Sequence, residues 1–316
     1  MASALPRSCG NSSSSTGPSA LTEGIILLDK PPGQTSFQSL GFLKRVLGTS
    51  RVGHAGTLDK FAEGLLVVLA GRMTRLCPFA TSLDKEYLAV FRFGVGTDTL
   101  DPEGTVNGEG PVPARQDIEK ALAAFRGAIS QVPPEYSAIH VDGKRASEAV
   151  RSGQEVRLEP RRVVVHRLDL QDYHPPEASF RIACSKGTYV RSLARDIAAA
   201  LGTCAHVRQL RRIRIGGFVV EDAHTPETFR AEEHVLPPAA FFSAAPALGR
   251  LVVRERWEEA ISRGIRLEEG MFERPPADGI FGAFTTNERL VAVIERAGAR
   301  LRYLAAFPET PAAADR

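Results

Sequence analysis

The 316-residue chain is poor in cysteine and has no long apolar run, and both shortages exclude classes of protein. Its four cysteines form no CxxC pair, which argues against a structural zinc site. They also give no disulfide framework, which fits the reducing cytoplasm where we expect the protein. These cysteines are Cys9, Cys77, Cys184 and Cys204. No stretch approaches the roughly 18 apolar residues of a membrane-spanning helix, so we do not expect the chain to span a membrane. Because of the cysteine spacing we do not expect a metal ion either.

Lysine is also scarce, since it supplies only seven of the 40 basic residues and arginine supplies the rest. The net charge is only +3, but seven basic residues and one acid, Asp196, fall between residues 186 and 214. The seven are Lys186, Arg191, Arg195, Arg208, Arg211, Arg212 and Arg214. Arginine suits phosphate forks and stacking on bases, so this surplus predicts a polyanionic partner. The alternative is a solvated basic face without a partner.

The first 20 residues are rich in serine and lack the apolar segment of a secretory signal, so we expect a disordered tail over 1–20. The rest is ordinary for a globular protein, because 43% of the chain is hydrophobic and 24% is charged. Its length allows more than one domain. A proline-rich stretch near residues 237–246 predicts a boundary, with one domain over 21–245 and a small β-rich one over 246–316.

Short strands and helices alternate between residues 21 and 240. Apolar and β-branched runs predict strands over 24–29, 65–69, 85–93, 163–170, 179–185 and 213–220. Helical spacing predicts helices from about 36 to 47, over 114–125 and from about 190 to 201. The first has Phe37, Leu40, Leu43 and Leu47 on one apolar face and follows a capping residue at Thr35 or Ser36. The pattern indicates an α+β fold with a mainly antiparallel sheet.

One glycine-rich stretch, Gly53-His54-Ala55-Gly56-Thr57-Leu58-Asp59, precedes a buried strand. Glycine at this density indicates positive φ angles or a close approach of the backbone to something. A carboxylate on such a loop, flanked by His54 and Lys60, is a candidate for chemistry. The alternative is a turn in which Asp59 bonds its own backbone.

Several segments resemble the tRNA pseudouridine synthase B (TruB) family, and they occur in the family's order. They are 28–36, 53–59, 85–87, 96–101, 136–138, 184–193, and 202–207 with 210–212. The resemblance implies a pseudouridine synthase fold, with a mixed, mainly antiparallel sheet flanked by helices and a PUA-like RNA-binding domain at the C-terminus. It also implies a cofactor-free isomerase that makes pseudouridine-55 in the T loop of tRNA, works as a monomer and needs no protein partner.

The same resemblance assigns roles to individual residues. Asp59 corresponds to the nucleophile, Tyr87 to a residue that stacks on the base and can take the C5 proton, and Arg191 to the partner that aims Asp59. The implied substrate-binding residues are His54, Lys30, Leu210, Gly53, Tyr189 and Lys186, with His54 as the wedge that fills the vacated stack. The candidate phosphate contacts are Lys144, Arg145, Arg208, Arg211 and Arg212.

Simpler interpretations stay open for the three principal residues. Tyr87 could be a core aromatic of its strand, Arg191 an exposed helix arginine and His54 a loop histidine. The chain also departs from the family at Ala55, Lys60 and Glu63 in the loop, at Ile139-His140, and at Ser147. Two other functions compete with the first: a tRNA-folding chaperone without catalysis, and a glycoside-type hydrolase that pairs Asp59 with Glu63.

Overall fold

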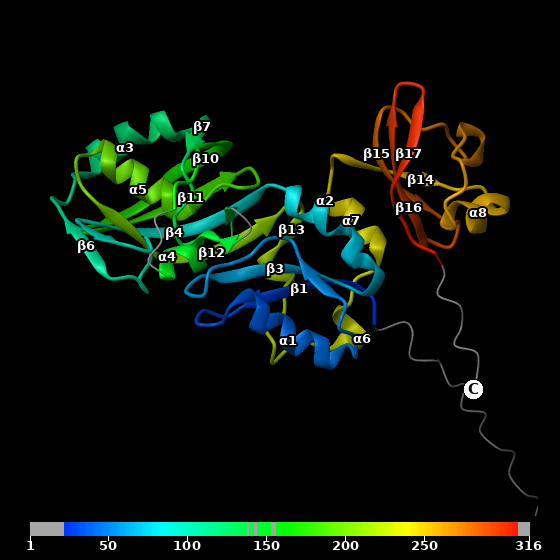
Figure 1. Ribbon diagram of the computed structural model, residues 1–316, viewed down its shortest axis with the longest axis horizontal. Coiled ribbons are helices and arrows are strands. Elements are labelled where there is room, and N and C mark those ends of the chain that lie inside the picture. The colour runs from blue at the N-terminus through cyan, green and yellow to red at the C-terminus, as the bar shows by residue number, and fades with distance from the viewer. Residues whose placement is uncertain (1–21, 138, 142–143, 153–155, 309–316) are drawn as a thin grey trace, which may run out of the picture.

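The computed structural model describes residues 22–308, apart from 138, 142–143 and 153–155. The predicted N-terminal tail therefore lies outside the described residues. Figure 1 shows a large body built around one sheet, and a smaller sheet formed by the C-terminal part of the chain. No helix of the described residues is long and apolar enough to cross a membrane.

The central sheet has the order β1-β3-β12-β4-β11-β10-β7, with β2 beside β3 and β13 beside β12. Its strands are β1 (Gly24–Lys30), β2 (Val52–His54), β3 (Glu63–Ala70), β4 (Lys85–Phe93), β7 (Gly127–Gln131), β10 (Arg161–His174), β11 (Glu177–Cys184), β12 (Ala205–Ile215) and β13 (Phe218–Val219). The neighbours run antiparallel except β3 and β12, which pair in parallel at Glu63–Arg211 and Gly64–Arg212. The predicted α+β class and the mainly antiparallel, mixed sheet are confirmed.

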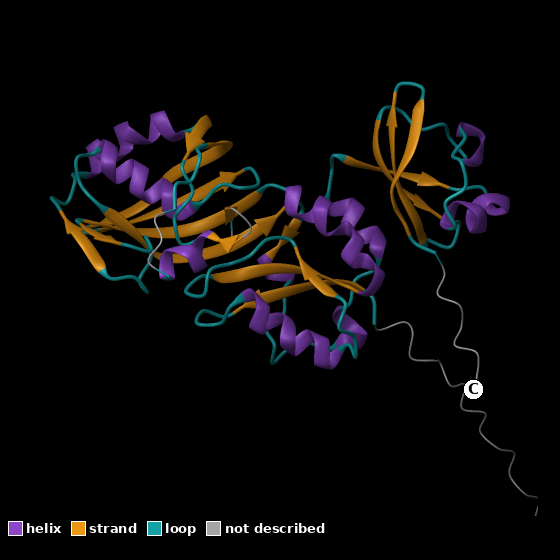
Figure 2. Cartoon of the chain, viewed as in Figure 1, coloured by secondary structure: helices purple, strands orange, loops and turns teal. Residues whose placement is uncertain are grey.

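Helices cover both ends of this sheet (Figure 2). They are α1 (Ser36–Val46), α2 (Cys77–Ser82), α3 (Arg115–Ala121), α4 (Ala146–Arg151), α5 (Val190–Ala200), α6 (Ala231–His234) and α7 (Pro238–Ala244). Leu193 and Ile197 of α5 pack on Phe91 and Phe180, whereas Leu43 of α1 belongs to a separate core under β1 and β3. The sheet therefore has a half around β1 and β3, with an apolar core on each face, and a half around β4 and β11, with one core.

Two short antiparallel pairs decorate the body: β5 (Val95–Thr97) with β6 (Val106–Glu109), and β8 (His140–Val141) with β9 (Lys144–Arg145). The C-terminal sheet consists of β14 (Leu248–Val252), β15 (Gly279–Phe284), β16 (Leu290–Ala297) and β17 (Arg300–Ala306), next to α8 (Glu258–Ser262). It has its own core and rests on α7, where Phe242 and Phe284 meet edge to face at 5.3 Å. The expected β-rich C-terminal part is confirmed.

The sequence pattern misplaces β12, which begins at Ala205 and not near Ile213. Two bulges, after Val207 and after Arg212, break the alternation of inward and outward side chains. Arginines within the strand hide its apolar character further. The sequence pattern also misses β5, whose three residues are too few to give a pattern.

Candidate active site

The loop between β2 and β3 holds Asp59 in a fixed place. Gly56 and Gly64 have φ angles of +113° and +101°, and a Cβ on Gly64 would lie 2.4 Å from the carbonyl oxygen of Arg212. The Ser36 hydroxyl donates to the Leu58 carbonyl (3.1 Å) and accepts from the Leu58 N–H (2.9 Å). The residue before Asp59 is therefore tied to the first turn of α1.

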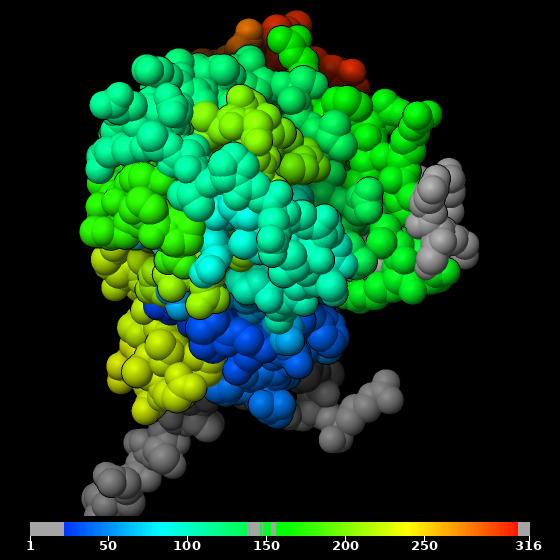
Figure 3. Space-filling model, turned by 90° about the vertical axis from the view of Figure 1, so that its left-hand side faces the viewer, coloured from blue at the N-terminus to red at the C-terminus, as the bar shows by residue number. Residues whose placement is uncertain are grey.

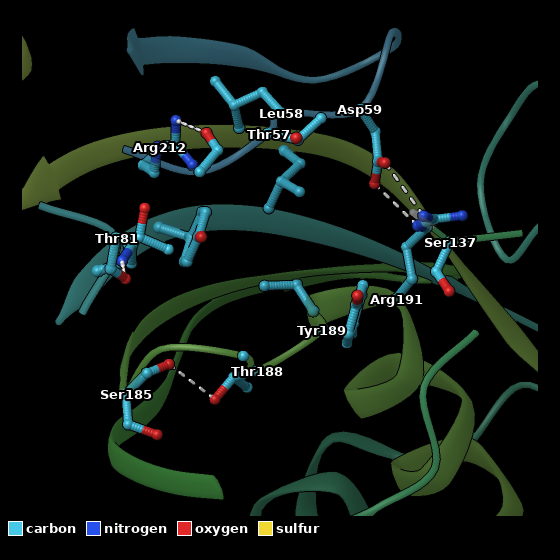
Figure 4. Close-up of a pocket in the computed structure, with 16 residues that line it drawn as sticks. Thr57, Leu58, Asp59, Thr81, Ser137, Ser185, Thr188, Tyr189, Arg191 and Arg212 are labelled. Carbon is cyan, nitrogen blue, oxygen red and sulfur yellow. Dashed lines mark hydrogen bonds and ion pairs between the residues drawn. The ribbon is translucent and has the colours of Figure 1, made fainter. Parts of the chain in front are cut away.

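The carboxylate of Asp59 faces the guanidinium of Arg191. Nη2 of Arg191 donates to Oδ1 of Asp59 at 3.0 Å, and Nε lies 2.8 Å from Oδ2 (Figure 4). Arg191 reaches this position because β11 ends at Cys184 and the chain turns directly into α5, whose first turn carries the arginine. The two side chains that the sequence paired do meet, so Asp59 is not a residue that merely caps its own turn.

Arg191 is a buried hub and not an exposed helix arginine, because only 4% of it is accessible. Its Nη1 donates to the Thr99 carbonyl (2.9 Å) and to Oδ2 of Asp101 (3.3 Å), and its Nη2 donates to the Tyr136 carbonyl (3.0 Å). The Thr99 hydroxyl holds Asp101 in turn at 2.6 Å. Asp101 therefore belongs to the site, and its only sequence signal was its place in the 96–101 segment.

The charge state of Asp59 follows from these neighbours. Burial raises the pKa of its carboxyl group above the usual range, Arg191 lowers it, and the negative Asp101 raises it again. The side chain keeps 36% of its surface open because it faces a cavity. An ionised Asp59 therefore depends on Arg191 as its counter-charge.

The cavity beside Asp59 has a volume of about 280 Å³, near the lower end for small-molecule sites. It is lined by Gly56, Thr57, Leu58, Asp59, Thr81, Lys85, Tyr87, Ser137, Ser185, Gly187, Thr188, Tyr189, Val190, Arg191, Leu210 and Arg212. Figure 4 shows Asp59 and Arg191 on one side of it and Thr81 and Ser185 on the other. Of the predicted residues, this lining brings together Asp59, Tyr87, Arg191, Tyr189 and Leu210, with Arg212 beside them.

Tyr87 lies on β4 with 8% of its surface accessible, and burial raises the pKa of its phenol to about 12. It is therefore a neutral group at physiological pH. It is both a core aromatic and a wall of the cavity, so the two interpretations drawn from the sequence are compatible.

Two lysines in this region are buried and differ in position. Lys85 lines the cavity, and its Nζ donates to the carbonyls of Thr81 (2.6 Å) and Leu83 (2.5 Å). Lys30 lies outside the lining and donates to the carbonyls of Pro31 (2.9 Å) and Gln34 (2.7 Å), which fits a structural role in that turn. Burial lowers the pKa of each ammonium to about 8. Sequence reasoning missed Lys85, whose signal is its position two residues before Tyr87 on the same face of β4.

Three further predicted residues are not part of the cavity lining: His54, Gly53 and Lys186. His54 ends β2 opposite Val68, and burial lowers the pKa of its imidazole, which favours the neutral ring. Gly53 is a packing position, because a Cβ there would lie 2.6 Å from the sulfur of Cys77. Lys186 is exposed in the turn that also presents Ser185.

The residues predicted to contact phosphate differ in exposure and in their partners. Arg208 is exposed, with Glu177 3.8 Å away, and Arg211 pairs with Asp29 at 2.7 Å. The prediction that Arg212 contacts phosphate is wrong. Arg212 is 1% accessible and donates to the carbonyls of Leu65 (2.8 Å) and Gly56 (3.1 Å), so it does not reach the surface. Lys144 and Arg145 form β9, and their side chains lie outside the described part.

The structure does not support a hydrolase that pairs Asp59 with Glu63. Glu63 lies outside the cavity lining and contacts Nη1 of Arg211 at 3.3 Å. The second acid of the site is Asp101, which is 5% accessible and bonded to Arg191. A glycosidase needs both carboxyl groups beside the substrate, and this arrangement offers one.

Comparison with known proteins identifies the family of this chain. Residues 44–190 match the TruB family pseudouridylate synthase N-terminal domain, and residues 191–236 match the tRNA pseudouridylate synthase B C-terminal domain. The tRNA pseudouridine synthase B of Borreliella burgdorferi (strain ZS7) is 45% identical over 206 residues, covering 64% of this chain and 73% of that protein. The enzyme of the same name from Leifsonia xyli is 38% identical over 295 residues, covering 90% of this chain and 96% of that protein.

Solved structures give the same fold. A Cbf5-Nop10-Gar1 complex matches with a TM-score of 0.66 and 25% identity, over 92% of this chain and 85% of that one. An archaeal box H/ACA sRNP Nop10-Cbf5 complex matches with a TM-score of 0.67 and 23% identity, over 91% and 87%. The matched segments contain Asp59, Tyr87, Arg191 and Leu210. This chain therefore belongs to the TruB family of tRNA pseudouridine synthases.

Proposed function

We propose that this tRNA pseudouridine synthase isomerises uridine-55 of the T loop, with Asp59 as its nucleophile. The observation that carries the proposal is the Asp59–Arg191 pair at the side of the cavity. The hydroxyl groups of the lining can bind a pyrimidine, and among the described lining residues Asp59 is the one that presents a carboxylate.

The reaction breaks the bond from C1′ to N1 and forms one from C1′ to C5, while the base loses the C5 proton and gains one at N1. Atoms and electrons balance without an oxidant or a co-substrate. The step needs a nucleophile that holds the sugar or the base while the glycosidic bond is open. An ionised Asp59 can do so by attack at C1′ or by addition at C6, and Arg191 fixes the direction of both oxygens.

The other cavity residues bind the base. We assign Tyr87 to packing against the flipped base, because its buried ring forms a wall of the cavity. Leu210, buried on β12, supplies an apolar wall. Tyr189 lies at the start of α5, on the same lining.

The target uridine must leave its stack to reach Asp59, which costs a few kcal/mol. We assign His54 to the vacated stack, because it is a neutral ring beside the cavity and not inside it. Lys186 is exposed in the turn that presents Ser185 to the cavity, and it suits a phosphate contact there. Arg208 is exposed beside Glu177, at the other end of β11, and suits a phosphate further from the cavity. The C-terminal β-rich part, as a PUA-like domain over 246–316, would add further contact with tRNA.

The test is incubation of unmodified tRNA with the purified protein alone, followed by mapping of pseudouridine. The wild type should modify position 55, and Asp59→Asn should abolish the product while tRNA affinity stays within about threefold. Asp196→Asn, on the far part of α5, is the matched control and should keep its activity. Product formed by Asp59→Asn, or a modified position other than 55, would contradict the proposal. An Asp59→Asn protein that makes no pseudouridine but still promotes tRNA folding as well as the wild type would favour the chaperone function.

A further inference from the structure

Phe37 lies on the surface although the spacing of α1 predicts it on the buried face. Leu40, Leu43 and Leu47 are buried as expected, but 74% of Phe37 is accessible, more than for any other large apolar side chain of the described residues. The helix is rotated so that Ser36 and Ser39 face inward. Exposure of a large apolar ring to water is unfavourable. A single exposed apolar residue does not by itself mark a binding site, so the residues around Phe37 decide whether it binds a partner.

The position of Phe37 is fixed relative to the catalytic loop. Ser36, its neighbour, makes two hydrogen bonds with the backbone of Leu58, and Leu58 precedes Asp59. Thr35 and Leu58 line a second, open hollow of about 560 Å³ that shares Arg191 with the catalytic cavity. Figure 3 shows the early part of the chain, in blue, at the surface beside the cyan segments that complete this hollow.

The helix that carries Phe37 is basic. Helix α1 carries Lys44 and Arg45 in its last turn and contains no acidic residue. The Nζ of Lys44 lies 5.3 Å from the centre of the Phe37 ring, on the same side of the helix, and leaves most of the ring open. An open aromatic ring beside cations is the arrangement that binds unpaired nucleotides, with bases stacked on the ring and phosphates on the cations.

We propose that Phe37 stacks on an unpaired base of the tRNA, and that this base is a neighbour of the uridine that enters the cavity. Lys44 and Arg45 would contact the phosphates of the same stretch of tRNA. The inference rests on the proposed function for the identity of the RNA. It adds a second contact to that site, outside the cavity and outside the segments that carry the chemistry. The absence of acids on α1 favours RNA over a basic partner protein.

The test compares tRNA dissociation constants of Phe37→Ser, Phe37→Trp and Val46→Ser. Val46 is the matched control, because it is 45% accessible on the same helix and faces the other side from Phe37 and Lys44. Stacking of one base corresponds to about a 5- to 150-fold loss of affinity for Phe37→Ser. Phe37→Trp should bind within about threefold of wild type, and Val46→Ser likewise. The maximal single-turnover rate of Phe37→Ser should stay within about threefold of wild type at saturating tRNA.

Equal affinity of Phe37→Ser and wild type for tRNA would overturn the inference, as would an equal loss in Val46→Ser. An affinity loss for Phe37→Ser that Phe37→Trp does not restore would also contradict stacking. Binding of tRNA unaffected by Phe37→Ser, together with capture of a partner protein that the variant loses, would assign the face to protein docking. Failure of the wild type to make pseudouridine would refute the proposed function instead, so the two failures are distinguishable.

Discussion

Replacement of Arg191 by lysine tests whether the site needs a fork or only a positive charge. The guanidinium serves four groups at once: Asp59, Asp101 and the carbonyls of Thr99 and Tyr136. An ammonium is a single point on a flexible stem and cannot span these acceptors. Lysine therefore keeps the charge that ionises Asp59 but loses the contact that fixes its second oxygen.

The magnitude follows from the lost contact. A hydrogen bond to a charged group contributes about 1.5–3 kcal/mol, which corresponds to about a 10- to 150-fold lower rate. Arg191→Met removes the charge as well, so the pKa of Asp59, already raised by burial, should rise further. Because the proposed reaction needs the ionised acid, the acid limb of the pH–rate profile should move to higher pH in Arg191→Met and stay near the wild-type position in Arg191→Lys.

The assay is tritium release from C5-labelled tRNA under single-turnover conditions, which isolates chemistry from product release. Arg195→Lys is the matched control, since Arg195 lies one turn further along α5, bonds Asp196 and the Val132 carbonyl, and is partly exposed. Circular dichroism should show that each variant is folded. A rate for Arg191→Lys within about twofold of wild type would refute the idea that the fork aims Asp59.

Two further predictions concern pH. Asp101→Asn removes a negative charge that raises the pKa of Asp59, so the acid limb of the rate profile should move to lower pH; an unmoved limb would mean that the two acids are not coupled. Lys85, whose pKa is lowered to about 8 by burial, should lose its charge as the pH rises through that value. If the charge serves the bound base, turnover should fall above about pH 8 in the wild type, and Lys85→Gln should lack that decline.

Sequence reasoning located Asp59 through its glycine-rich loop, and the resemblance to the family added Tyr87 and Arg191. Gly56 and Gly64 need left-handed backbone, and the strand-to-helix turn after Cys184 delivers Arg191 to a fixed place. The α+β class followed from the alternation of short strands and helices. The catalytic roles stay predictions until the variants are measured.

What sequence reasoning missed depends on tertiary contacts. Arg212 looks like a phosphate contact in a basic run, yet the bulged register of β12 turns it inward onto two carbonyls. Phe37 fits an apolar stripe, but the bonds of Ser36 to Leu58 set the rotation of α1. Lys85 is an ordinary strand residue until β4 is seen to line the cavity.

The parallel contact of β3 with β12 joins the two halves of the sheet. Only two residue pairs join these strands, so the seam between the halves of the sheet is thin where Asp59 and Arg191 face each other from opposite sides. The guanidinium of Arg212, on β12, crosses that seam and donates hydrogen bonds to the carbonyls of Leu65 and Gly56. The relative placement of Asp59 and Arg191 thus depends on the joint between the two halves of the sheet. A substitution that loosens this joint should lower activity although it changes neither of the two side chains.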